Sequence, residues 1–153
     1  MKENKHIAII DIGSNSIRLR LSLNEEVILR KNITTQLSRD MSGGYLSDES
    51  IQRTLIGLCE LISDCIAVNA QIYIFATAAV RNALNGNEFT SLFNKAFNMP
   101  IDVLSGEDEA EMGILGALGG KDGCVIDVGG ASSELVISHN KKIIPRQKFA
   151  LDF

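Results

Sequence analysis

The first stretch that decides the fold of this chain is residues 7–19, IAIIDIGSNSIRL. An apolar, largely β-branched run leads through Asp11 to a turn of Gly, Ser and Asn, and a second apolar run begins at Ile17. Two such runs around a Gly-containing turn are typical of a β-hairpin. Gly13 and its polar neighbours allow unusual backbone angles and leave N–H groups that can converge on an anion. The stretch therefore predicts a hairpin whose turn binds an anion.

Residues 125–137, VIDVGGASSELVI, repeat this pattern near the other end of the chain. Both stretches place Asp-x-Gly-x-x-Ser between two apolar runs. One such hairpin is weak evidence, since many hairpins contain Gly and Ser, but two with equal spacing indicate a phosphate held between two related loops. The candidate phosphate-binding residues are Gly13, Ser14, Asn15 and Ser16 in the first loop and Gly129, Gly130, Ala131 and Ser132 in the second.

The composition restricts the class of protein. With 153 residues, 45% of them hydrophobic and 22% charged, the chain can form a domain with a core and is too apolar to be disordered. A formal net charge of -4 argues against binding DNA through a basic surface, whereas a phosphorylated ligand needs only local positive charge. No apolar run reaches membrane-spanning length, and Cys59, Cys65 and Cys124 form no Cys-x-x-Cys pair. We therefore expect a cytoplasmic protein with reduced, mostly buried thiols.

Hydrophobic periodicity divides the chain into strands and helices. Strands at residues 7–11, 17–23 and 27–34 are expected to form an antiparallel meander. Ser47 is the expected N-cap of a helix over residues 48–68, and a strand at 71–76 follows it as in a βαβ crossover. The remaining elements are expected as a short helix from Thr77, a helix over 88–97 ended by Pro100, a strand over 101–104, a helix over 105–118, and strands over 124–128, 132–138 and 142–149.

This order of elements indicates an α/β protein with a mixed sheet, followed by the start of a second unit of the same kind. The Gly-rich stretch 119–123 is the expected boundary, which gives a first domain over residues 1–120 and the beginning of a second over 121–153. The second unit ends before helices could cover both faces of its sheet. The chain is therefore expected either to be a fragment of a longer protein or to dock its last hairpin on another subunit, and a homodimer stays open.

Asp11 and Asp127 end apolar strands at equivalent points of the two stretches. An aspartate there commonly caps its own turn, but two in matching frames favour holding a metal or a water beside the anion. Mg²⁺ suits such a site because it takes few carboxylates and keeps several waters while it bridges phosphates.

Arg81 falls in the expected first turn of the helix that begins at Thr77, where a cation opposes the helix dipole. An anion bound between Arg81 and the helix N-terminus would explain this position. A solvent-exposed arginine, at a cost of roughly a few tenths of a kcal/mol, explains it equally well, so both interpretations stay open.

Two glutamates are candidates for acid–base chemistry. Glu109 leads a helix face that continues through Gly113 and Gly116, so another backbone is expected to come close to that face. A carboxylate in such a cleft can have a raised pKa and serve as a base. Glu134 shares a strand face with Ser132, although an outward-facing strand residue is the simpler interpretation of its position.

Four motifs together resemble the exopolyphosphatase and guanosine pentaphosphate phosphatase (Ppx/GppA) family, within the actin, sugar-kinase and Hsp70 superfamily. They occur in the order of the family and cover nearly the whole chain. The motifs are DIGSNSIRL at 11–19, ATAAVRNA at 76–83, SGEDEA at 105–110 and DVGGASSEL at 127–135.

The resemblance implies an actin-like ATPase (ribonuclease H-like) fold whose two loops bind phosphate. Arg81 would match the phosphate-binding arginine of the family, and Glu109 the glutamate that activates water. Asp11, Asp127 and Glu134 would match acidic residues around the metal and the water. The implied activity is Mg²⁺-dependent hydrolysis of the terminal phosphoryl group of inorganic polyphosphate or guanosine pentaphosphate.

Two departures from the family pattern keep alternatives open. Ala131 stands where the family usually has a third Gly, and family members continue well past residue 153. One alternative is a non-catalytic phosphate or nucleotide sensor on the same scaffold. Another is an ATPase or kinase of the superfamily, against which the motifs around Arg81 and Glu109 speak.

Overall fold

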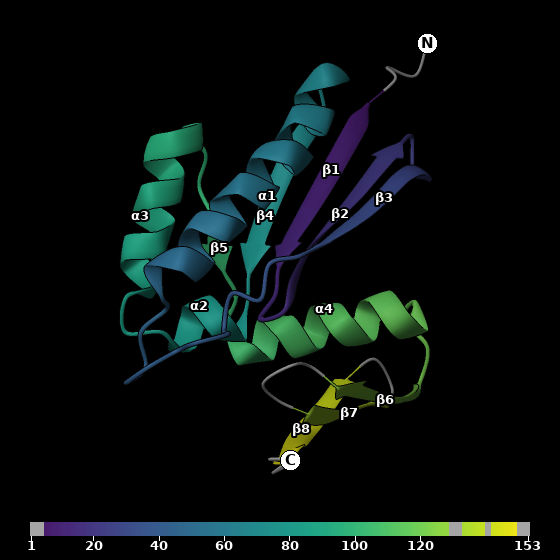
Figure 1. The fold of residues 1–153 in the computed structure, drawn as a ribbon. Coiled ribbons are helices and arrows are strands. Elements are labelled where there is room, and N and C mark those ends of the chain that lie inside the picture. Colours follow the sequence, from purple (N-terminus) through teal and green to yellow (C-terminus); the bar gives the residue numbers. More distant parts are fainter. Residues whose placement is uncertain (1–4, 129–132, 140–141, 150–153) are drawn as a thin grey trace. The chain divides into compact units, whose positions relative to one another are not determined.

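The structure is a computed structural model that describes residues 5–128, 133–139 and 142–149, with elements in the order β-β-β-α-β-α-α-β-α-β-β-β (Figure 1). Internal packing divides it into two compact units, Met1–Val103 and Leu104–Phe153. This division falls ahead of the Gly-rich stretch 119–123, so the helix before that stretch packs with the second hairpin. The assignment of residues 1–120 and 121–153 to two domains stays a prediction.

The first unit is built on a five-stranded sheet in the order β3-β2-β1-β4-β5. The first three strands form the expected antiparallel meander, while β4 pairs parallel with β1 and β5 parallel with β4. The sheet is therefore mixed, and the connection from β3 to β4 is the expected crossover through a helix. The strands are β1 His6–Ile12, β2 Ser16–Leu23, β3 Glu26–Thr34, β4 Gln71–Ala76 and β5 Asp102–Val103.

Helices α1 (Asp48–Ala67) and α3 (Gly86–Phe97) cover one face of this sheet, because both share a core with the strands. Leu58 and Leu61 of α1 and Phe89 and Phe93 of α3 are fully buried in that core. Ser47 caps α1 as expected, since its side chain accepts a hydrogen bond from the Ser50 N–H. The crossover rule for parallel strands explains why both helices lie on the same face.

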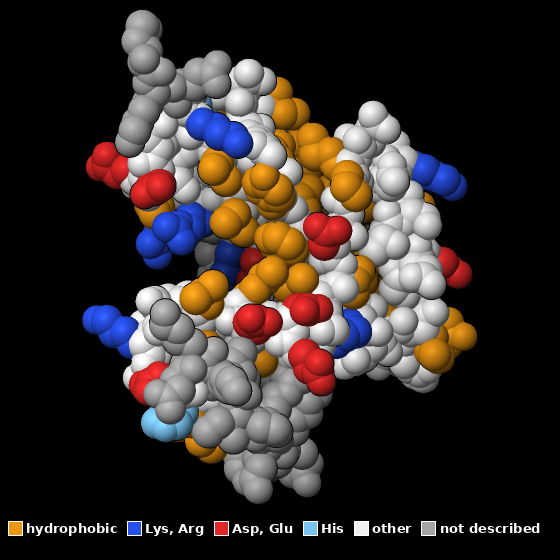
Figure 2. Space-filling view, turned by 180° about the vertical axis from the view of Figure 1, so that it is seen from behind, with side chains coloured by type: hydrophobic (Ala, Val, Ile, Leu, Met, Phe, Trp, Pro, Cys, Tyr) orange, Lys and Arg blue, Asp and Glu red, His pale blue; other side chains and the backbone are white. Residues whose placement is uncertain are grey.

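The other face of the sheet is left uncovered by the helices of this unit. Ile9, Ile28 and Tyr73 are exposed on it, and Arg20 and Arg30 lie directly opposite each other in the strand register. Figure 2 shows hydrophobic side chains gathered over this part of the molecule, with basic side chains beside them. We call this surface the open face.

The second unit consists of α4 (Gly106–Leu118) and an antiparallel meander of β6 (Gly123–Val128), β7 (Ser133–His139) and β8 (Lys142–Phe149). Its small core contains Ala110 and Ile114 of α4 and Val136 of β7. Ile126 of β6 is exposed, as expected for a sheet with a helix on one face only.

Helix α3 ends at Phe97 as expected, with Asn98 in a left-handed conformation and Pro100 two residues further on. The expected strand over 101–104 is present but spans only Asp102–Val103. One expectation was wrong. The thiols are not mostly buried: all three are free, but Cys59 and Cys124 are exposed and only Cys65 is buried.

Within the ranges that the structure describes, no helix is both long and apolar enough to cross a membrane.

Candidate functional site

The turn between β1 and β2 is closed by its own backbone. The Gly13 N–H donates to the Ser16 carbonyl at 3.0 Å, and a Cβ on Gly13 would lie 3.1 Å from that same oxygen. This contact is tighter than side chains usually allow, so glycine suits the position. We call residues 13–16 the phosphate turn, after the ligand that the sequence predicts for it.

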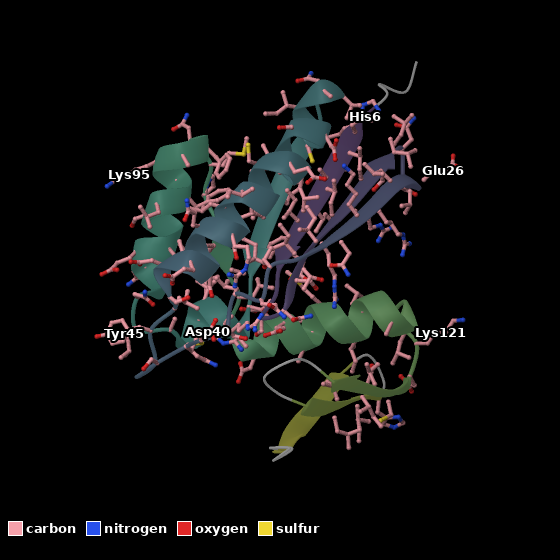
Figure 3. All side chains as sticks on the ribbon, viewed as in Figure 1. His6, Glu26, Asp40, Tyr45, Lys95 and Lys121 are labelled. Carbon is pink, nitrogen blue, oxygen red and sulfur yellow. The ribbon has the colours of Figure 1, made fainter. Side chains whose placement is uncertain are left out.

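The phosphate turn lies at the carboxyl edge of the sheet. Because β1 and β4 are parallel, both strands end at this edge, where ligands of open α/β sheets usually bind. The Thr77 N–H donates to the Ile12 carbonyl at 3.2 Å, which brings the start of α2 (Ala78–Asn82) next to the turn. Figure 3 shows Asp40, in the loop after β3, at this end of the sheet, and His6 and Glu26 at the opposite end.

A second segment, residues 35–38, packs along the phosphate turn, and we call it the strap. The N–H groups of Thr35 and Gln36 donate to the Asn15 carbonyl at 3.1 Å and 2.8 Å. The N–H and the hydroxyl of Ser38 donate to the Ser14 carbonyl at 3.0 Å and 3.2 Å. The strap therefore satisfies both carbonyls at the tip of the turn.

The N–H groups of the phosphate turn differ from its carbonyls in their hydrogen bonding. In the part of the chain that the structure describes, the N–H groups of Ser14 and Asn15 donate to no other backbone group. Consecutive backbone N–H groups of this kind form anion-binding concavities in proteins. The backbone of the turn therefore has the form of an anion site, and its binding of a phosphoryl oxygen stays a prediction.

Arg81 is half-buried in α2, which starts beside the phosphate turn. It is the fourth of only five helical residues and lies in the last turn, where a cation is favourable to the helix dipole. The expectation that its charge opposes the dipole was therefore wrong. Its position is still compatible with binding an anion, because α2 starts beside the phosphate turn.

Asp11 lies in β1, two residues before the phosphate turn, and its register partner on β2 is Arg18. It lines a hollow of about 350 Å³ on the open face. Sequence reasoning missed the arginines of this hollow, although their alternate positions on β2 and β3 put them on one face. The lining residues are Ile9, Asp11, Arg18, Leu19, Arg20, Arg30, Lys31 and Asn32.

The residues present fit Mg²⁺ only together with a phosphate. No group of three metal-ligating side chains occurs within residues 5–128, 133–139 and 142–149, and Asp11 shares its hollow with several cations. A single carboxylate surrounded by cationic side chains is a poor binding site for a metal ion that brings no anionic ligand with it. Mg²⁺ carried on phosphate oxygens needs only one or two carboxylates, and Asp11 would supply one of them.

Glu109 lies in the first turn of α4 and is half-buried. The turn is fixed by Ser105, which accepts from the Asp108 N–H at 3.1 Å and donates to its carboxylate at 2.6 Å. Glu109 lines a cavity of about 250 Å³ within the second unit, with Ala110, Gly113, Ile114, Val125, Ile126 and Val136. Apart from Glu109, the residues that line this cavity are apolar or glycine.

The glycines of α4 were expected to let another backbone come close. A Cβ on Gly113 or Gly116 would meet no atom within 4 Å, so no described backbone of the second unit packs closely there. The expected close approach stays a prediction.

The second loop is only partly described. Asp127 and Glu134 are register partners on β6 and β7, as the predicted hairpin requires. Gly129, Gly130, Ala131 and Ser132 lie outside the described residues, so their phosphate-binding role stays a prediction.

This chain is similar to known proteins in both sequence and fold. Residues 17–147 match the model of the Ppx/GppA phosphatase family. A Ppx/GppA family member from Aquifex aeolicus is 27% identical with a TM-score of 0.76, over 95% of this chain and 51% of that one. An exopolyphosphatase from Cytophaga hutchinsonii is 23% identical with a TM-score of 0.84, over 95% of this chain and 50% of that one. The chain thus spans about half the length of these relatives.

A more distant similarity concerns the fold alone. The protein MreB5 of Spiroplasma citri, in a structure bound to ADP, is 15% identical with a TM-score of 0.56, over 95% of this chain and 52% of that one. The α/β fold with an actin-like architecture is thereby confirmed. With the family model covering most of the sequence, the chain belongs to the Ppx/GppA phosphatase family.

Proposed function

We propose that this chain carries phosphoryl-binding and water-activating residues of a hydrolase that removes the terminal phosphoryl group of inorganic polyphosphate or of guanosine pentaphosphate. The observation that carries the proposal is the phosphate turn: a turn at the carboxyl edge of β1 and β4, with its carbonyls bonded to the strap and N–H groups left for an anion. Membership of the Ppx/GppA family supports the reaction class.

The first part of the proposed chemistry is binding. The N–H groups of Ser14 and Asn15 would bind phosphoryl oxygens, and the guanidinium of Arg81 would offset their charge. Phosphoryl transfer depends mainly on positioning and charge stabilisation, so such groups can supply much of the rate enhancement. The loop over residues 129–132 would bind phosphate in the same way.

The second part is the activation of water. Glu109, half-buried at its cavity, would orient or deprotonate the water that attacks phosphorus in line with the leaving group. Glu134 would assist in holding that water. Mg²⁺, when bound with phosphate at Asp11 and Asp127, would neutralise negative charge on the phosphate oxygens.

A phosphate sensor without turnover is the second candidate, because Ala131 stands where the family usually has a third Gly. Both functions require phosphate binding, and they differ in whether phosphate is released. We assign the protein to the cytoplasm and propose no DNA partner under either function.

The experiment measures binding and turnover separately in the complete protein, because the isolated 153-residue chain spans only about half the length of its relatives. Binding of inorganic tripolyphosphate is measured by calorimetry, and phosphate release from polyphosphate and from guanosine pentaphosphate is measured with and without Mg²⁺. Glu109→Gln is expected to lower release by about 10²-fold or more while tripolyphosphate binding is kept. Glu111→Gln, an exposed glutamate of the same helix, is the control and should change neither quantity.

Each outcome separates the alternatives. Release that survives Glu109→Gln would remove Glu109 from the mechanism. Binding without release by the complete wild-type protein would favour the sensor, and absence of binding by the complete protein would end both.

A further inference from the structure

We infer that Arg53 of α1 is a positioning residue for the phosphate turn, acting through the strap. The inference rests on the proposed function of the turn and names a residue that the motifs of the family resemblance do not include. Arg53 itself lies in neither the turn nor the strap, so its action is indirect.

Arg53 fastens the strap to helix α1. Its Nε donates to the Thr35 carbonyl at 2.6 Å, and one terminal nitrogen donates to the Gln36 carbonyl at 3.2 Å. The same nitrogen donates to the Ser50 hydroxyl at 3.2 Å, one turn earlier in the helix. Hydrogen bonds from a charged donor are stronger than neutral ones, so a single side chain holds two consecutive peptide groups.

The strap passes this restraint on to the phosphate turn. Thr35 and Gln36, whose carbonyls bind Arg53, donate their N–H groups to the Asn15 carbonyl. Ser38 donates to the Ser14 carbonyl two residues further along. A continuous chain of hydrogen bonds therefore connects Arg53 to the tip of the turn.

The geometry of the peptide bond explains how this chain of hydrogen bonds can orient the N–H groups of the turn. In a planar trans peptide the C=O and the following N–H point in opposite directions. Because the Ser14 carbonyl points to the strap, the N–H group of Asn15, one of the two N–H groups proposed to bind phosphate, points away from it. The strap thus determines the direction in which the turn offers donors to a phosphoryl oxygen.

Arginine is better suited to this task than lysine. Its guanidinium presents several N–H donors in a rigid, planar fork, so it can bond adjacent carbonyls at once, whereas lysine offers a single flexible ammonium. Arg53→Lys would keep the charge and lose the fixed pair of bonds. The side chain of Arg53 belongs to an exposed residue, so its removal should leave the core intact.

The first test needs no ligand. Hydrogen exchange is measured by NMR for the Gly13, Thr35, Gln36 and Ser38 amides of the 153-residue chain. Arg53→Ala and Arg53→Lys are expected to speed exchange at these amides about tenfold, with core amides of β1 and β4 unchanged. Lys95→Ala, which removes an exposed cation from α3, is the control. Unchanged exchange at these four amides in both variants would overturn the inference.

The second test uses inorganic tripolyphosphate as the probe. Both Arg53 variants are expected to bind it about tenfold more weakly, and added guanidinium ion should restore binding to Arg53→Ala but not to Ser38→Ala. Equal affinity in wild type and both variants would overturn the inference. Failure of the complete wild-type protein to bind would refute the proposed function, and the exchange measurement would then still decide whether Arg53 orders the turn.

Discussion

The side chain of Asn85 makes two hydrogen bonds with the backbone of Leu46, one as acceptor and one as donor, as paired residues of neighbouring β-strands do. Its side-chain oxygen accepts from the Leu46 N–H at 2.8 Å, and its side-chain nitrogen donates to the Leu46 carbonyl at 3.0 Å. The two residues are 39 positions apart, and Asn85 is buried. A single amide side chain thus holds the end of the loop before α1 against the start of α3.

Removal of this pair should be costly. Asn85→Ala leaves a buried N–H and carbonyl of Leu46 without partners, and we expect the free energy of unfolding to fall by about 2–4 kcal/mol. Denaturant unfolding measures the change. Asn87→Ala, at an exposed position two residues later, is the control and should stay within about 0.5 kcal/mol of wild type. An equally small change for Asn85→Ala would show that water replaces the pair.

Two helical glycines should respond to alanine in opposite directions. A Cβ on Gly86 would lie 2.2 Å from the Val80 carbonyl oxygen, so Gly86→Ala must displace backbone and should destabilise the chain by more than about 2 kcal/mol. A Cβ on Gly116 would meet nothing within 4 Å, so Gly116→Ala should stabilise α4 by about 0.5–1 kcal/mol. Thermal unfolding of both variants tests the pair. The same sign of change in both would contradict the described environments.

The three thiols should differ in reactivity. Burial raises the pKa of Cys65 to about 11, while Cys59 and Cys124 are exposed. At pH 8 a thiol reagent should therefore label two cysteines of the folded chain quickly and the third only after unfolding. Peptide mapping of the labelled chain identifies the sites. Fast labelling of Cys65 in the folded chain would show that the α1 interface opens readily.

The same thiol predicts how stability depends on pH. The folded state disfavours the Cys65 thiolate, so the stabilising contribution is complete below the unfolded pKa of 9.0 and is lost as pH rises through about 11. The loss should stay below about 3 kcal/mol, the free energy that corresponds to this difference in pKa. Comparison of wild type with Cys65→Ala between pH 8 and pH 11 isolates this contribution, because the variant should lack the corresponding decline.

Like charges on the open face should cost stability. Arg20 and Arg30 are direct cross-strand partners, and like charges in that arrangement are unfavourable. Arg20→Glu should therefore stabilise the chain by about 0.2–1 kcal/mol at low salt, and the gain should shrink at 1 M salt. The double variant with Arg30→Glu restores repulsion and should lose the gain. A salt-independent effect would assign the change to packing instead of charge.

The regular elements were predictable because local patterns determine them. The alternation in β1–β3 and the helical spacing of Leu58 and Leu61 specify which face is buried, and Ser47 marks the start of α1 by the chemistry of its side chain. The phosphate turn was predictable for the same reason, since its residues are contiguous.

What escaped prediction depends on contacts between distant segments. The strap contacts the phosphate turn through backbone groups of Thr35 and Gln36. Backbone hydrogen bonds do not require a particular side chain, so the sequence gives no signal of them. Arg53 is one polar residue on a helix surface and gives no signal until the strap is placed beside it. The place of Arg81 in its helix was misjudged because α2 has only five residues, a length that Ala83 and the following turn impose.

The open face has a practical consequence for work with this chain. Ile9, Ile28 and Tyr73 leave hydrocarbon in contact with water in the native state. Fluorescent dyes that light up on apolar surfaces should therefore bind the folded chain and give a high signal before any heating. For this chain, circular dichroism or calorimetry should therefore follow unfolding more directly than a dye-based melting curve.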